Sequence, residues 1–179
     1  SGPMTAHPKI DPESGEMLFF AYNADPENRV SSRMAFHKAD KHGNLVQSEC
    51  FDAPYSAMVH DFIVTKEHVI FPIMPLTSSM ERAMGGDSLY AWDPTKNSYI
   101  GIMPRDGCSS DLRWFEGDPA YVFHPMNAYN DGDKIICDVC EYPEAPLFPH
   151  ADGSKPDPTK STAKLTRWTF DLNANTNTY

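Results

Sequence analysis

The sequence predicts an all-β fold that forms part of a β-propeller, and three observations carry this prediction. Short strand-like runs recur along all 179 residues, each bounded by turn-forming residues. The 16 prolines and 10 glycines interrupt the chain too often for long helices. An aromatic strand that runs into an acidic turn recurs three times at intervals of roughly 55 to 75 residues, close to the length of a propeller blade.

The expected strands are short apolar or aromatic runs flanked by turn residues. They occupy residues 17–22, 33–36, 61–64, 68–73, 88–92, 134–139 and 165–170. Asp and Asn form turns by bonding their own backbone, and Gly accepts positive φ. Turn sequences of this kind occupy residues 40–44, 93–97 and 130–133. Hairpins along the whole chain follow from this alternation.

Two segments depart from the strand pattern. A short helix is expected at residues 77–84, where a hydroxyl residue can cap the start, Glu81 comes early, and two glycines follow. Residues 142–160 contain five prolines and are expected to form an extended loop without regular structure.

The charge and hydropathy of the chain exclude several partners. A formal net charge of -10 repels nucleic acid and anionic membranes, and Lys and Arg are scattered rather than clustered. No apolar run approaches the roughly 20 residues that a membrane helix needs, and the first residues lack the pattern of a signal peptide. We therefore expect a soluble, cytoplasmic protein with no nucleic-acid or membrane partner. A homodimer is left open.

The four cysteines are expected to be free thiols, because the chain is not short and carries no export signal. Cys137 and Cys140 have the spacing of a redox or metal pair. They fall within a predicted strand, where residues three apart point to opposite faces. A structural role is therefore the prediction for this pair.

Three histidines stand out by their spacing. His7, His60 and His124 occupy similar settings beside apolar residues, acids or prolines, and 53 and then 64 residues separate them. A helical zinc site or a zinc finger takes several ligands from one local turn. Widely spaced single histidines instead predict a metal site that receives one ligand from each structural repeat. One lone strand histidine is more often structural, so the prediction depends on all three.

The remaining histidines are expected to be exposed, namely His37, His42, His68 and His150. The sequence also lacks the Gly-x-Ser-x-Gly elbow of serine hydrolases and the glycine-rich loops that bind phosphates. These absences weigh against serine hydrolases, dehydrogenases and kinases. Paired carboxylates for glycoside cleavage stay open, because 25 acidic residues allow many combinations.

An all-histidine site suits Zn, Cu, Fe or Ni, and the ligand type alone does not select the ion. Three segments add a family resemblance: Thr5-Ala6-His7-Pro8-Lys9-Ile10-Asp11-Pro12, Met58-Val59-His60-Asp61-Phe62 and Phe123-His124-Pro125-Met126-Asn127-Ala128-Tyr129. In order and approximate spacing they resemble the carotenoid cleavage oxygenase family. Residues 90–94 and 100–105 make the stilbene-cleaving branch, the lignostilbene dioxygenases, the most similar one.

This resemblance implies a seven-bladed propeller with loop insertions and a non-haem Fe(II) held by four histidines. His7, His60 and His124 map onto the first three ligands. The fourth ligand is implied beyond Tyr179, and the carboxylates that orient the ligands are implied outside the matched region. Residues 1–179 are accordingly expected to be a single domain, the central portion of a larger propeller, and to be inactive in isolation.

The function implied is an iron-dependent dioxygenase that uses O2 to cleave the central C=C bond of phenolic stilbenes into two aldehydes. Phe123 and Tyr129 are candidates for binding the aromatic alkene, with core packing as the alternative for each. Cleavage of carotenoids or apocarotenoids is the alternative within the family. A metal-free propeller that serves as a binding module, or a zinc hydrolase, is the alternative from another class.

Overall fold

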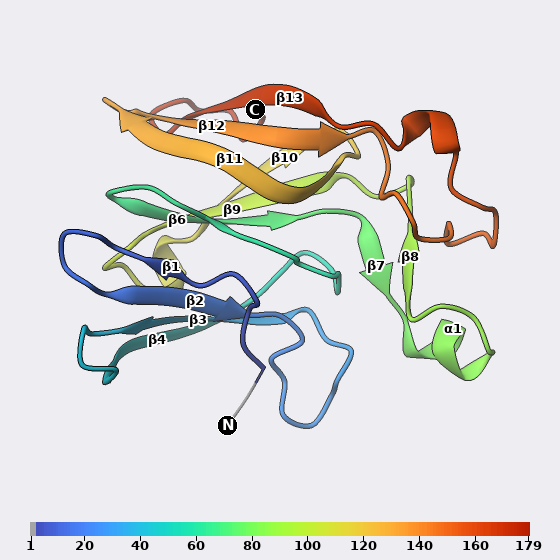
Figure 1. Ribbon diagram of the computed structural model, residues 1–179, viewed down its shortest axis with the longest axis horizontal. Helices are drawn as coiled ribbons and strands as arrows, with labels where there is room; N and C mark the ends of the chain where they lie inside the picture. The colour runs from blue at the N-terminus through green and yellow to red at the C-terminus, as the bar shows by residue number, and fades with distance from the viewer. Residues whose placement is uncertain (1–2) are drawn as a thin grey trace.

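The computed structural model describes residues 3–179 and consists mainly of antiparallel β-sheet (Figure 1). The first sheet contains β1 (Lys9–Ile10), β2 (Met17–Ala21), β3 (Arg33–Ala39) and β4 (Leu45–Asp52). The second contains β5 (Ile63–Val64), β6 (His68–Ile73), β9 (Ser98–Pro104) and β10 (Arg113–Gly117). The third contains β11 (Tyr121–Asp131), β12 (Lys134–Tyr142) and β13 (Lys164–Asp171).

Smaller elements complete the structure. Strands β7 (Leu76–Ser78) and β8 (Tyr90–Trp92) form a two-stranded sheet, and the segment of chain that connects them contains the helix α1 (Met80–Met84). Two single-turn helices are η1 (Ser109–Asp111) and η2 (Pro158–Lys160). No helix within residues 3–179 is long and apolar enough to cross a membrane.

The three larger sheets stack one above another like successive propeller blades (Figure 1). Their strand orders place β1, β5 and β11, the first strand of each sheet, at a sheet edge. Within residues 3–179 the sheets do not close into a ring, so this is part of a propeller. The predicted all-β class is confirmed. The single-domain assignment of residues 1–179 stays a prediction.

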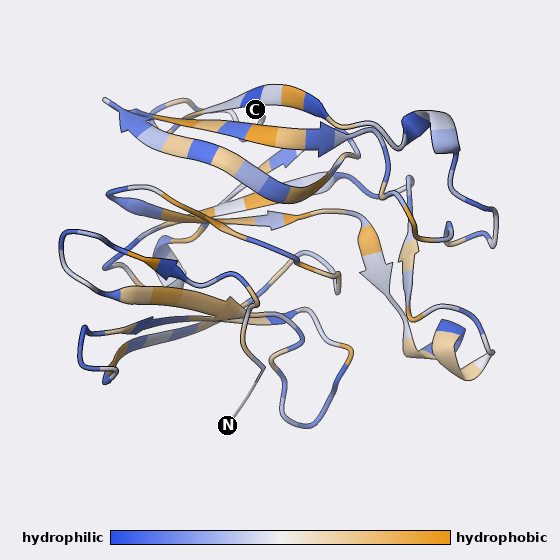
Figure 2. Ribbon diagram, in the orientation of Figure 1, coloured by the Kyte–Doolittle hydropathy of each residue, from blue (hydrophilic) through white to orange (hydrophobic). Residues whose placement is uncertain are grey.

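The middle sheet is buried on both faces. Phe71 on β6 packs in one hydrophobic cluster with residues of the first sheet, whereas its neighbour Ile70 packs in a second cluster with residues of the third sheet. A strand covered on both sides is apolar along its whole length, which explains the continuous run of β6. Figure 2 shows the apolar residues along the strands and hydrophilic residues at many of the hairpin ends.

The predicted helix at residues 77–84 begins too early. Thr77 and Ser78 belong to β7 and pair with Ala91 and Tyr90 of β8. Ser79 then caps α1, and its Oγ accepts a hydrogen bond from the backbone N of Arg82. Sheet pairing with a distant strand therefore overrides the local helix signal, and the capping hydroxyl is the third of the three candidates.

The predicted loop at residues 142–160 is mostly irregular, with η2 as the exception. Its middle runs beside β8: the backbone N of Trp92 donates to the Pro149 carbonyl, and the backbone N of Ala151 donates to the Trp92 carbonyl. The loop is thus tied to the body of the protein. Cys137 is buried and Cys140 exposed, as predicted for opposite faces of β12.

Candidate metal centre

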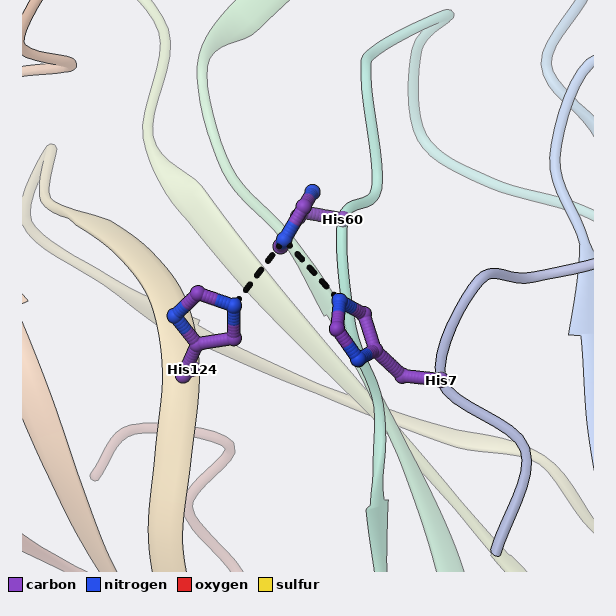
Figure 3. Close-up of side chains that lie close together, drawn as sticks. All are labelled: His7, His60 and His124. Atoms are coloured by element: carbon purple, nitrogen blue, oxygen red, sulfur yellow. Dashed lines mark hydrogen bonds between the residues drawn. The ribbon is translucent and has the colours of Figure 1, made fainter.

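His7, His60 and His124 converge on one point. The Nε2 atom of His60 lies 3.1 Å from Nε2 of His7 and 3.1 Å from Nε2 of His124 (Figure 3). One ligand atom from each of the three residues lies within 4.8 Å of the others. The structure therefore brings together all three histidines that their spacing singled out.

Each histidine comes from the start of a different sheet. His7 precedes β1 and His60 precedes β5, both on irregular chain, whereas His124 is the fourth residue of β11. The three imidazoles therefore meet where the first strands of three sheets approach one another. This is the arrangement of one histidine per repeat that the spacing predicted, and the role of the three as metal ligands stays a prediction.

Hydrogen bonding among the three rings is a poor account of this geometry. An imidazole nitrogen carries either one proton or one lone pair, and not both. Nε2 of His60 therefore cannot donate to one neighbouring ring and accept from the other. Metal–imidazole bonds are about 2.0–2.1 Å long, so two Nε2 atoms at right angles on one ion lie about 2.9 Å apart. The two separations of 3.1 Å about His60 are close to the distance between neighbouring ligands on one cation.

The surroundings of His60 favour its neutral form. Burial lowers its pKa from the ordinary 6.5, repulsion from His124 and His7 lowers the pKa further, and Asp61 opposes the shift. A neutral ring keeps the lone pair that a metal needs. The three residues are a donor set that could hold a metal ion, and of the three only His124 is exposed.

Phe123 lies at this centre, and Tyr129 lies away from it. The ring of Phe123 meets that of His60 edge to face, with ring centroids 5.5 Å apart. Phe123 also contacts Tyr121 at 4.7 Å between centroids, so it both packs in the core and borders the three histidines. Tyr129 is five residues beyond His124 on β11, about 16 Å away along an extended strand. The substrate-binding roles of both residues stay predictions.

A cavity of about 430 Å³ lies beside the centre. The segments that follow the three histidines line it, including Lys9, Phe62 and Met126, but the imidazoles do not. The three histidines therefore define the candidate site, and the cavity is open space next to it.

Of the four histidines predicted to be exposed, only His42 is. His37, His68 and His150 are half-buried. Nδ1 of His37 lies 2.9 Å from Ser48 Oγ, and Nδ1 of His68 lies 3.0 Å from Asn130 Nδ2. These partners are on other strands. The charged or turn-forming residues next to these histidines in the sequence therefore wrongly indicated that the side chains are exposed.

Comparison with known proteins gives consistent matches. A family model described as retinal pigment epithelial membrane protein matches residues 1–179. The isoeugenol monooxygenase of Pseudomonas putida is 43% identical over 171 residues, which are 95% of this chain and 35% of that protein. The chain thus spans about a third of the length of this relative.

Two solved structures are similar as well. The lignostilbene dioxygenase of Pseudomonas brassicacearum superposes with a TM-score of 0.91 and 36% identity, over 98% of this chain and 37% of that one. The cobalt-substituted apocarotenoid oxygenase of Synechocystis superposes with a TM-score of 0.77 and 27% identity, over 96% of this chain and 37% of that one.

Proposed function

We propose, from the premise that this chain belongs to the RPE65/carotenoid oxygenase family, that the polypeptide carrying it is an oxygenase that cleaves a carbon–carbon double bond. The family resemblance predicted from the three histidine segments is thereby confirmed. The observation that carries the proposal is the convergence of three Nε2 atoms from three sheets.

The proposed cofactor is Fe(II), held by His7, His60 and His124. Three imidazoles suit several ions, and the choice of iron follows the family. Bound iron supplies a place where O2 can react beside the alkene. Within this chain, burial disfavours protonation of the His60 imidazole, and Phe123 packs against its ring and holds it in place. Phe123 also covers part of the centre with apolar surface.

The proposed substrate is an alkene conjugated to a phenolic ring, with a phenolic stilbene as the leading member. The reaction consumes the C=C bond and one O2, and each former alkene carbon becomes a carbonyl carbon. A stilbene would thus give two aldehydes. The similarity to the lignostilbene dioxygenase, with 36% identity and a TM-score of 0.91, supports a stilbene as the substrate.

A propenyl phenol is the second candidate. It is favoured by the higher identity, 43%, of the isoeugenol monooxygenase. The names of the two relatives also differ in how many oxygen atoms of O2 reach the products. Stilbene, propenyl phenol and apocarotenoid therefore all belong in a test of substrate.

The test uses the longest form of the polypeptide that carries residues 1–179. The protein is loaded with Fe(II) without air, then given O2 and one of three alkenes: a hydroxylated stilbene, isoeugenol or an apocarotenoid. Carbonyl products are identified by mass spectrometry. Omission of iron and of O2 gives two controls, and Zn(II) in place of iron gives a third.

The expected result is cleavage of a phenolic alkene that requires both iron and O2. With ¹⁸O2 and immediate reduction of the products, label in both products indicates a dioxygenase and label in one indicates a monooxygenase. If the protein binds iron but cleaves only the apocarotenoid, the proposed phenolic substrate is wrong and an apocarotenoid takes its place. A protein that binds no iron would overturn the oxygenase proposal.

A further inference from the structure

The segments that carry His7 and His60 are joined by a side-chain ion pair next to both ligands. Lys9, two residues after His7, places Nζ 2.8 Å from Oδ1 of Asp61, the residue that follows His60. The Asp61 side chain is only 6% exposed, and that of Lys9 is 32% exposed. Removal of one partner of such a pair destabilises the fold, because it leaves a buried charge with neither a counter-ion nor water around it.

Asp61 also shapes the chain beside His60. Its Oδ1 accepts a hydrogen bond of 2.8 Å from the backbone N of Phe62. Lys9 in turn lies over the Phe62 ring, with Nζ 5.7 Å from the ring centroid. Both partners are therefore fixed by more than their mutual attraction, and the pair has a defined geometry.

The pair links parts of the protein that sheet hydrogen bonds do not link. β1 pairs only with β2, in the first sheet, and β5 pairs only with β6, in the second. His7 and His60 themselves lie on irregular chain, where no strand ladder sets their separation. The contact between residues 9 and 61 joins the two segments within two residues of each imidazole.

We propose that Lys9 and Asp61 are positioning residues for the metal centre: their ion pair holds the His7 and His60 imidazoles at ligand distance. The inference rests on the proposed metal site and deepens it. It assigns the alignment of two ligands to side chains within this chain. Loss of a residue that orients a metal ligand typically weakens metal binding by about 10–100-fold, and we expect an effect of this size for the pair.

The test uses Lys9→Met, Asp61→Asn and the double variant in the longest polypeptide that carries the chain. Met keeps most of the aliphatic length of Lys9, and Asn keeps an oxygen for the Phe62 N–H. The double variant leaves no buried charge without a partner, so its unfolding midpoint should stay close to that of the unchanged protein. Lys9→Arg keeps the charge and should retain the geometry.

A matched control is the pair Arg167 and Asp138. Arg167 Nε lies 2.7 Å from Asp138 Oδ1, and the side chains are 59% and 11% exposed. This pair also joins a partly exposed cation to a buried acid. It connects neighbouring strands within the third sheet, at the register pair Asp138 and Arg167. The double variant Arg167→Met/Asp138→Asn thus removes the same charges without loosening the His7–His60 spacing.

Two readouts are measured. Side-chain NMR of histidine labelled with ¹⁵N, in metal-free protein, should show the His7 and His60 ring signals shifted and broadened in the Lys9→Met/Asp61→Asn variant, with the His42 signal unchanged. Titration with Co(II) or Fe(II) should show roughly 10–100-fold weaker binding. The control variant and Lys9→Arg should match the unchanged protein in both.

Unchanged ring signals and unchanged metal affinity in the double variant would overturn the proposal and leave the pair a role in stability alone. If the double variant does not fold, Lys9→Met against Lys9→Arg decides the same question, because Lys9 is the more exposed partner. A protein that binds no metal in any form would refute the proposed function, while the metal-free ring signals would still decide the role of the pair.

Discussion

The Nε2 atoms of His7 and His60 lie 3.1 Å apart, although 53 residues separate them in the chain. The first sheet and the loop that follows it occupy the intervening residues. The chain enters the first sheet just after His7 and enters the second sheet just after His60, and the two points of entry lie side by side. The centre is thus a product of the order in which the sheets follow one another.

Replacing His60 or His124 by Ala should abolish iron retention and leave the β-sheet content intact. Each substitution removes one of three nitrogens that converge on the centre, and the loss should exceed the roughly 100-fold typical of outer partners. Iron is measured by elemental analysis after gel filtration, and β-sheet content by circular dichroism. His42→Ala, at an exposed hairpin turn, is the control. Retention of iron by both variants would refute the site.

Acid should destabilise the metal-free protein already below pH 6.5. Burial lowers the pKa of His37 and of His68 from 6.5, so the unfolded chain binds protons that the folded protein does not. Stability is then fully present above pH 6.5 and declines as pH falls through the lowered pKa values. Urea midpoints at pH 7.5 and 5.5 measure this decline.

A His37→Gln/His68→Gln double variant isolates these two groups. It should show a smaller difference between the two urea midpoints than the unchanged protein shows. His42→Gln should leave the difference as it is. An equal difference in all three proteins would assign the acid sensitivity to other groups.

Gly101→Val should destabilise the packing of β9 against β10 in the second sheet. A Cβ at residue 101 would lie 2.7 Å from a Trp114 ring carbon, and Trp114 is the register partner of Gly101. Overpacking of this kind costs about 1–3 kcal/mol. Denaturant unfolding measures the loss. Trp114→Leu should recover part of it in the double variant, and purely additive losses would contradict the contact.

Arg113→Lys should loosen the last residues of the chain. The Arg113 guanidinium donates to the carbonyls of Leu172, Ala174 and Thr176 and to Asn177 Oδ1. A lysine ammonium cannot reproduce this fork of donors, and hydrogen bonds from charged groups are each worth about 1.5–3 kcal/mol. Hydrogen exchange should rise in residues 172–179. Arg33→Lys, whose partner Asp52 is exposed, is the control.

The sequence was sufficient to predict the all-β class and the three converging histidines. Both depend on patterns that survive without tertiary information, namely frequent turn residues and an unusual spacing. The strands that were not predicted are β1, β4, β7, β9, β10 and β11, and β4 and β11 have a clear physical reason. β4 exposes most of its residues, and β11 contains register shifts near Pro125 that break the alternation of apolar and polar positions.

The contact between Lys9 and Asp61 had no signal in the sequence at all. Both residues stood inside the family-like segments, yet nothing local joins a lysine in the first strand of one sheet to an aspartate just before the next sheet. The same holds for His68, whose partner Asn130 belongs to the third sheet. Pairs of this kind become visible only when the sheets are stacked.

Three sheets each contribute one imidazole, and this has a consequence for the order of assembly. His124 belongs to the first strand of the third sheet, so the three imidazoles do not come together until that sheet has docked on the second. An ion that needs all three nitrogens binds the stacked form and not its precursors, and by mass action it favours the stacked form. Metal loading would therefore come late in folding and act as a cross-link that opposes separation of the sheets.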